Sequence, residues 1–154
     1  MNKRFWTLNA AAAAILLFQA LAVAGDTATG AKARADVIMP ADSIKWEDGP
    51  AKGVHIANLW GDMMKGGPYG TLVKFDAGVM HPMHWHTRTL KVVVLSGTFI
   101  HHADGGEEVK LGPGSYLLQA GGKHHSSGAS ADGPCEFFLT SQGKFDMHMV
   151  EDKK

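Results

Sequence analysis

Residues 78–97 read GVMHPMHWHTRTLKVVVLSG, a histidine-rich segment that leads into a run of apolar and β-branched residues. His84 and His86 are separated by a single residue, Trp85. Because successive side chains of a β-strand point to opposite faces, a strand here would present both imidazoles on one face. Such a pair can hold a divalent ion when the strand twists or bends and a further ligand comes from another strand. The segment therefore predicts a strand that carries two metal ligands.

A third ligand is expected from the segment GSYLLQAGGKHH at residues 114–125. His125 follows a glycine-rich turn and is the candidate, with His124 as the local alternative. Seven of the nine histidines fall between residues 81 and 125. Solvated loop histidines or a packing cluster are the alternative interpretation, but an H-x-H pair followed by a second histidine-containing turn favours a metal site.

The rest of the chain predicts an all-β domain over residues 36–154. Short apolar runs recur between glycine and proline breaks, which is typical of a sandwich or barrel, and no stretch of a dozen residues has a helical period. The expected strands are 55–60, 69–75, 90–95, 98–102, 107–111, 115–119, 135–140 and 145–150. Alternation in the 135–140 run places Cys135 beside Phe137 and Leu139, so a buried, inert thiol is expected.

The first residues have the features of a targeting signal. Lys3 and Arg4 precede an uncharged, alanine- and leucine-rich run that ends in Ala22-Val23-Ala24. This pattern predicts a signal peptide over residues 1–24, cleaved before Gly25, although an N-terminal membrane anchor is the alternative. Residues 25–35 are expected to form a flexible leader. The mature protein is then secreted or periplasmic, with no stable membrane anchor.

Composition narrows the function classes. The chain has 154 residues, with 15 basic and 15 acidic side chains, so no basic nucleic-acid footprint is expected. A single cysteine excludes an internal disulfide framework and a cysteine-based zinc finger. No Ser/His/Asp nucleophile arrangement is evident, and Gly112-Pro113-Gly114 forms a turn rather than a phosphate-binding loop. A small molecule is the expected partner.

The two histidine segments resemble the two motifs of the cupin superfamily. Residues 78–97 resemble the first motif, in which glycine and five residues precede H-x-H, then glutamate, and glycine after six more residues. Residues 114–125 resemble the second. The resemblance implies a cupin-type double-stranded β-helix, or jelly-roll barrel. Two departures matter: Leu90 or Lys91, according to the spacing, stands in the glutamate position, and Ala120 stands where the second motif has proline.

The resemblance also implies a ligand set and an activity. The ligands carried over are His84, His86 and His125 without a carboxylate, which is similar to the three-histidine dioxygenases rather than to the four-ligand germins. It implies a metal-dependent dioxygenase acting on a small oxygenated or aromatic compound, with Fe(II) favoured over Zn, Mn or Ni. The alternatives are a non-catalytic binding or sensing cupin, or a Zn or Ni hydrolase, lyase or isomerase.

Further histidines and one glutamine complete the candidate site. Alternation places one of His101 and His102 in the barrel, as a ligand, a hydrogen-bond partner or a general base, unless both are surface residues. Gln119 lies near the barrel rim, where it could orient a ligand or water, and His81 is expected at the barrel mouth. Cupins often pair through their sheets, and the apolar run 92–95 permits a homodimer.

Overall fold

The computed structural model describes residues 35–151 and contains eleven β-strands and one short 3₁₀ helix, Ala41–Ser43. All of these strands lie in one compact unit that begins at Ile38. The predicted signal peptide, residues 1–24, and residues 25–34 of the predicted leader lie outside the described residues. Within residues 35–151, no helix is long and apolar enough to span a bilayer.

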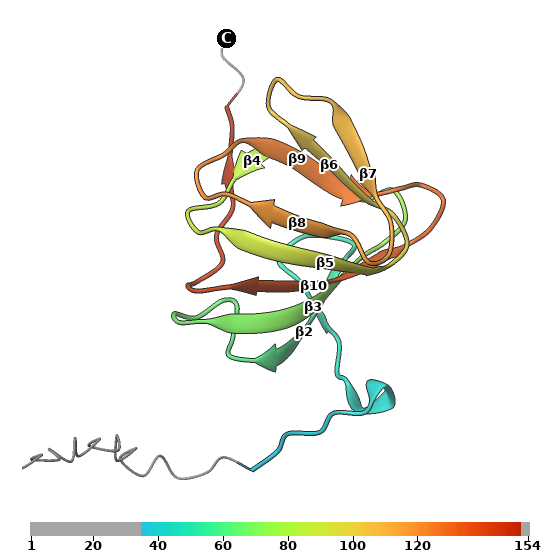
Figure 1. Cartoon of the computed structure of the whole chain (residues 1–154), viewed down its shortest axis with the longest axis vertical. Coiled ribbons are helices and arrows are strands. Elements are labelled where there is room, and N and C mark those ends of the chain that lie inside the picture. The colour runs from blue at the N-terminus through green and yellow to red at the C-terminus, as the bar shows by residue number, and fades with distance from the viewer. Residues whose placement is uncertain (1–34, 152–154) are drawn as a thin grey trace, which may run out of the picture. The chain divides into compact units, whose positions relative to one another are not determined.

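The strands form two antiparallel sheets, which can be followed in Figure 1. The larger sheet has the order β1 (Glu47–Asp48), β2 (Val54–Trp60), β3 (Tyr69–Phe75), β10 (Cys135–Ser141), β5 (Leu90–Ser96) and β8 (Tyr116–Gln119). The smaller sheet has the order β11 (His148–Met149), β4 (Met80–Trp85), β9 (His125–Ala129), β6 (Phe99–Ala103) and β7 (Glu108–Leu111). The prediction of an all-β jelly roll is confirmed.

The structure differs from the expected strands in three places. The first is β1, a two-residue edge strand that no apolar run predicts; the other two have a physical reason. The apolar runs do not reveal β9, because its sequence His-Ser-Ser-Gly-Ala is short-chained and polar; it is a strand because β4 and β6 pair with it on either side. The run at residues 145–150 is strand only over His148–Met149, and residues 145–147 leave the sheet to pass the candidate site.

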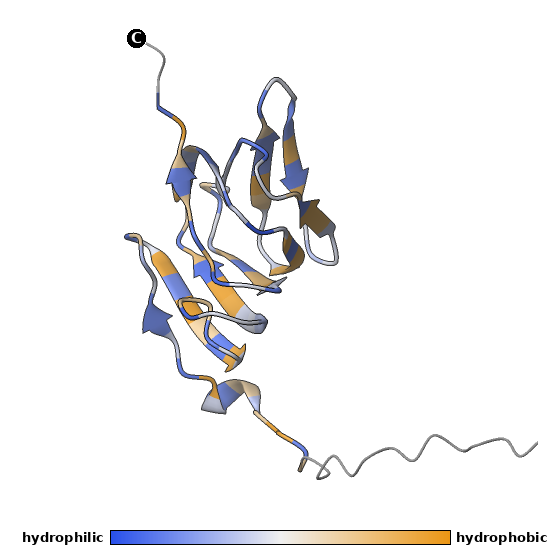
Figure 2. Cartoon of the chain, turned by 90° about the vertical axis from the view of Figure 1, so that its left-hand side faces the viewer, coloured by the Kyte–Doolittle hydropathy of each residue, from blue (hydrophilic) through white to orange (hydrophobic). Residues whose placement is uncertain are grey.

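The core forms from alternate residues of the larger sheet. Along β10, buried residues alternate with half-buried ones, so that Cys135, Phe137 and Leu139 share the inner face, as expected. Figure 2 shows bands of hydrophobic and hydrophilic residues along several strands of the two sheets. Burial raises the pKa of the Cys135 thiol to about 11, so the thiolate is scarce at neutral pH and the residue is a packing group.

The motif glycine at position 97 has a structural role in the turn between β5 and β6. Gly97 has a φ of 70°, and a Cβ atom there would collide with the Pro134 carbonyl oxygen. Glycine alone accepts both the left-handed backbone and this close approach at little cost. The turn lets the chain leave the larger sheet after β5 and enter the smaller sheet as β6.

Candidate metal centre

The inner face of the smaller sheet brings the histidines together by strand register. His84 of β4 lies directly opposite His125 of β9, and His81 lies opposite Ser127. Between these pairs β4 has three residue steps where β9 has two, which is a β-bulge. The bulge contains Pro82, a residue that strands accept at such irregularities. Because of the extra residue, His81 and His84 both face the interior although they are three positions apart.

His86 lies just beyond β4, where a turn of the second motif contacts it. The Gly122 N–H donates a hydrogen bond of 2.8 Å to the His86 carbonyl oxygen. Gly122 itself has a φ of 73°, within the left-handed region that favours glycine. This contact joins the H-x-H pair to the turn that precedes His125, so the two motifs meet at one place.

Three imidazoles converge in the interior: His84, His86 and His125 each offer one ring nitrogen, and these nitrogens lie within 4.8 Å of one another. The residues are 1%, 5% and 1% exposed, respectively. Ligands about 2.1 Å from a shared ion lie roughly 3–4 Å apart, so a small contraction would complete a site. The group could hold a divalent metal ion. His124, the alternative to His125, faces outward, with its Nδ1 3.7 Å from the Asp104 carboxylate.

Hydrogen bonds orient all three rings in the same way. The Nδ1–H of His84 donates to the Pro82 carbonyl at 2.6 Å, that of His86 to the Asp146 carbonyl at 2.5 Å, and that of His125 to the Lys123 carbonyl at 3.1 Å. A carbonyl oxygen can only accept, so Nδ1 of His84 and of His86 carries the proton and Nε2 keeps a lone pair. Nδ1 of His125 also lies against the Gln119 side-chain nitrogen, which can only donate, so the same tautomer of His125 requires the Gln119 amide to turn its oxygen toward the ring. Histidines that bind metals are held by such outer partners, and this donor set therefore fits a metal ion.

Burial keeps these imidazoles uncharged. It lowers the pKa of His86 to about 4 and that of His125 to about 3, because a buried charge loses its hydration. Burial also lowers the pKa of His84 below its ordinary value of 6.5. All three side chains are therefore neutral at pH 7, the form in which imidazole binds a metal ion.

The imidazoles line one part of an apolar cavity of about 360 Å³. Aromatic and aliphatic side chains make up most of its lining, and no lysine or arginine between residues 35 and 151 contributes to it. Leu90, which stands in the glutamate position of the first cupin motif, is 5% exposed and lines the cavity, whereas Lys91 faces solvent. Among the described residues, the only carboxylate in the lining is that of Asp146, and it accepts a hydrogen bond from the Thr87 N–H.

The other predicted site residues separate into inner and outer groups. Gln119 is buried, lines the cavity, and its side-chain amide contacts Nδ1 of His125. His101 faces inward, with its ring centroid 5.4 Å from that of His125, and its Nδ1 is buried without a partner among the described residues. His102 faces away: its Nε2 lies 2.9 Å from the Gly106 carbonyl oxygen in the turn after β6. His81 lines the cavity, 6.1 Å from the His84 ring, between centroids.

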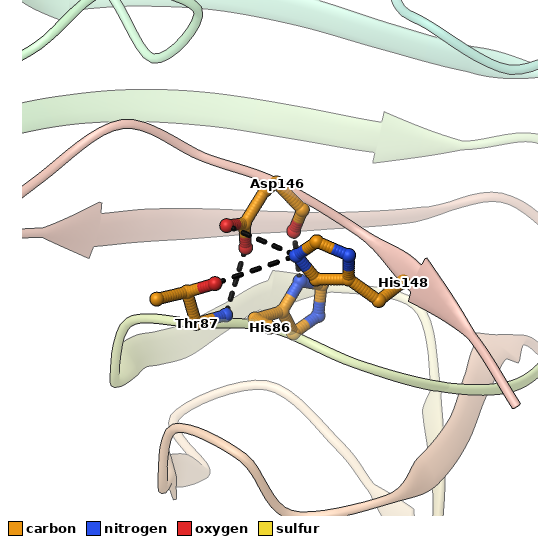
Figure 3. A network of polar contacts seen from close by, with 4 residues as sticks. All are labelled: His86, Thr87, Asp146 and His148. Carbon is orange, nitrogen blue, oxygen red and sulfur yellow. Dashed lines mark hydrogen bonds and ion pairs between the residues drawn. The ribbon is translucent and has the colours of Figure 1, made fainter.

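Sequence patterns did not point to the C-terminal residues at this site. The Asp146 carbonyl holds His86, while the Asp146 carboxylate contacts Thr87 and His148 (Figure 3). The Phe145 ring also packs against His86, with the centroids 5.1 Å apart. The sequence offers one hint: residues 145–148 include an aromatic, an acidic and a histidine side chain. This composition does not predict that the segment passes beside the histidines.

Comparison with protein families shows a match over most of the described chain. Residues 34–146 match the family described as the ChrR Cupin-like domain. The DNA damage-repair/toleration protein DRT102 of Arabidopsis thaliana is 32% identical over 100 residues, which cover 59% of this chain and 32% of the plant protein. The matched region is thus about a third of the length of that relative.

Several solved structures share the fold. The polyketide cyclase RemF from Streptomyces resistomycificus has a TM-score of 0.64 at 18% identity, covering 78% of this chain and 89% of that one. KdgF from Halomonas sp. has a TM-score of 0.57 at 21% identity, covering 69% and 94%. The DMSP lyase DddQ from Ruegeria pomeroyi has a TM-score of 0.58 at 17% identity, covering 73% and 64%. At these identities the likeness shows a common fold alone.

Proposed function

This chain belongs to the family of ChrR cupin-like domains, and from that premise we propose that it is a metal-dependent enzyme of the dioxygenase type. The proposed substrate is a small compound with a metal-chelating oxygen group on an apolar or aromatic body. One observation carries the proposal: three neutral imidazoles, with no carboxylate among the candidate ligands in residues 35–151, line an apolar cavity.

The ligand set supports an anionic, chelating substrate group. We propose His84, His86 and His125 as the ligands, through Nε2. Three neutral donors leave a divalent ion its full charge inside a largely apolar cavity. The one carboxylate in the lining among the described residues, that of Asp146, is already held by the Thr87 N–H and His148. An enolate or phenolate would offset that charge, while phosphorylated substrates would find no lysine or arginine in the lining. The ion, for which we favour Fe(II) over Zn, Mn or Ni, would supply a Lewis acid with open positions and the redox chemistry needed for dioxygen insertion.

Two neighbours of His125 support the proposed site, one by orienting the His125 ring and the other by holding a proton. Gln119 contacts the Nδ1 edge of His125 and would hold this ring in place while its amide remains at the cavity wall. The imidazole of His101 is neutral at pH 7, because burial lowers its pKa, and it would hold a proton next to the proposed centre. We leave His102 out of the proposed site because it bonds to an exposed turn.

Oxygen uptake by the iron-loaded protein tests the proposal. The protein would be purified without a polyhistidine tag, analysed for bound metals, loaded anaerobically with Fe(II), and supplied with β-diketones, catechols and aromatic hydroxy-ketones in an oxygen electrode. We expect stoichiometric iron and substrate-dependent oxygen uptake. His84→Ala should lose both, whereas His124→Ala, which changes an outward-facing histidine, should retain both. Iron binding without turnover across this panel would reject the dioxygenase and favour a binding or sensing role.

A second candidate is a redox-neutral lyase, isomerase or hydrolase that uses Zn or Ni. The position of His101 favours it, because this half-buried neutral imidazole lies beside His125, and its buried Nδ1, which has no partner among the described residues, could accept a proton without any oxidant. Under strict anaerobiosis, turnover of the same panel by the zinc-loaded protein would support this candidate and exclude dioxygen as a reactant.

The proposed location is outside the cytoplasm. The basic start of the chain, its apolar run and the small residues at 22–24 support a signal peptide over residues 1–24. Expression of the full chain with fractionation of the host cell would test this proposal: a processed N-terminus at Gly25 in the exported fraction is expected, and an intact N-terminus in the cytoplasm would contradict it.

A further inference from the structure

The C-terminal segment, residues 145–150, passes along the end of β4, where the H-x-H pair begins in the strand at His84 and continues just beyond it at His86. In register, His148 lies opposite Trp85 and Met149 opposite His84, and the His148 ring stacks on Trp85 with the centroids 4.2 Å apart. At the two ends of the segment, Phe145 and Val150 donate their N–H groups to backbone carbonyls at 2.8 and 3.0 Å. The segment is therefore attached on both sides of Asp146.

Asp146 connects this segment to the H-x-H pair through two different groups (Figure 3). Its carbonyl oxygen accepts the Nδ1–H of His86 at 2.5 Å. Its carboxylate accepts the Thr87 N–H at 2.8 Å and lies 3.2 Å from Nε2 of His148, which is itself 3.3 Å from the Thr87 hydroxyl. The backbone oxygen of Asp146 thus contacts His86, while the side chain of Asp146 contacts the next residue, Thr87.

The three ring partners differ in where they come from. His84 and His125 are held by carbonyls only two residues away in the sequence, within their own strands and turns. His86 is held by a carbonyl 60 residues away. The orientation of His86 therefore depends on how well the C-terminal segment is docked, and the Asp146 carboxylate is the side-chain group that docks it beside this ring.

We propose that Asp146 is a positioning residue for His86: its carboxylate fixes the C-terminal segment on Thr87, so that its carbonyl oxygen holds Nδ1–H of His86 and directs Nε2 toward His84 and His125. The inference rests on the metal site proposed above. It assigns to the C-terminal segment a role in ligand orientation and metal affinity. Partners of this kind typically change metal affinity by about 10–100-fold when removed.

Nuclear magnetic resonance of the metal-free, ¹⁵N-labelled protein gives a direct readout, because the two ring nitrogens of His86 report which one carries the proton. We expect the Nδ1–H tautomer in the wild type and a mixture of tautomers in Asp146→Ala. A Co(II) titration followed by visible absorption should show roughly tenfold weaker binding in Asp146→Ala. Asp146→Asn keeps an acceptor for the Thr87 N–H and should restore both properties.

A matched control is Asp48→Ala, which removes an aspartate–histidine pair (Asp48 to His55, 3.3 Å) on the edge strand β1 and should change neither readout. An unchanged tautomer and affinity in Asp146→Ala would overturn the inference. The inference would also be overturned if Asp146→Asn bound Co(II) as weakly as Asp146→Ala, because the loss of affinity would then come from the lost charge and not from the lost hydrogen bond.

The failures of the two proposals are distinguishable. If the wild type binds no Co(II), the metal site is wrong, while the tautomer of His86 still tests Asp146. If circular dichroism shows that Asp146→Ala is unfolded, Asp146→Leu, which keeps side-chain bulk without an acceptor, replaces it under the same criteria.

Discussion

Leu90 stands in the position where the first cupin motif has glutamate, and its side chain lines the cavity beside the three imidazoles. In the sheet it lies directly opposite Gln119, whose amide contacts His125. This pair therefore provides an apolar group and a neutral amide where a carboxylate ligand would otherwise be. A divalent ion in the site would keep its full charge, which is why the proposed substrate is anionic at its chelating end.

Restoring the carboxylate tests this account. In Leu90→Glu, we expect the metal-free protein to lose roughly 2–4 kcal/mol in free energy of unfolding, because a buried acid has no charged partner there. A bound ion should reverse the loss, and the affinity for Zn(II) should rise above that of the wild type. Urea unfolding and a competitive metal titration measure both quantities.

Lys91→Glu is the control for that experiment, since it adds the same acid on the solvent side of the same strand. It should change the free energy of unfolding by no more than about 0.5 kcal/mol and leave metal affinity unchanged. If Leu90→Glu binds Zn(II) no better than the wild type, position 90 does not reach the ion.

At the scale of a single element, β10 shows how a strand links the two sheets. It pairs with β3 and β5 in the larger sheet, while its inward side chains reach the smaller one. Phe137 contacts Phe75 of β3 and Phe99 of β6, each edge to face with centroids 5.0 Å apart. Its neighbour Phe138 lies on the outer face against Trp60. The two faces of one strand therefore contribute very different amounts of buried surface.

Alanine substitutions at these adjacent positions measure the difference. Phe137→Ala should cost about 3–5 kcal/mol in free energy of unfolding, because it leaves a void between the sheets. Phe138→Ala should cost only about 1 kcal/mol, since this ring is half-buried. Chemical denaturation of the metal-free proteins gives both values, and equal costs would contradict the assigned inner and outer faces.

Across the whole molecule, the buried histidines couple stability to pH. Burial lowers the pKa of His86 to about 4 and that of His125 to about 3, below the ordinary value of 6.5 that applies in the unfolded chain. Below pH 6.5 the unfolded chain therefore binds protons that the folded protein excludes. This contribution to stability is fully present above pH 6.5 and decreases as the pH falls toward 4.

For the metal-free protein, we expect the free energy of unfolding to be level above pH 6.5 and to fall by at most about 1.4 kcal/mol per pH unit for each such imidazole below it. His86→Phe should show a shallower decline, because one proton-binding group is absent from the unfolded chain. Identical slopes in His86→Phe and the wild type would exclude His86 from the acid response. Urea unfolding at a series of pH values measures these slopes.

Most of the fold could be predicted because its signals are local. Apolar runs between glycine and proline breaks mark β10 and β5, and the spacing of glycines and histidines marks the two motifs. The metal-ligand candidates could be predicted from the short spacing of the H-x-H pair, although β4 ends at Trp85 and His86 lies just beyond the strand. The strand β9 escaped that reasoning because its residues form no apolar run, and it is a strand through its pairing with β4 and β6.

The choice between His124 and His125, and between His101 and His102, needed the register of three strands, because alternation says only that neighbours point in opposite directions. The contact of Asp146 with His86 joins residues 60 positions apart. Short-range sequence patterns say nothing about which residues meet over such a separation. Residue types and their short-range spacing therefore determine which chemistry the barrel can contain. The pairing of β4 with β9, and the docking of the C-terminal segment beside β4, decide which imidazole nitrogens lie together in the cavity.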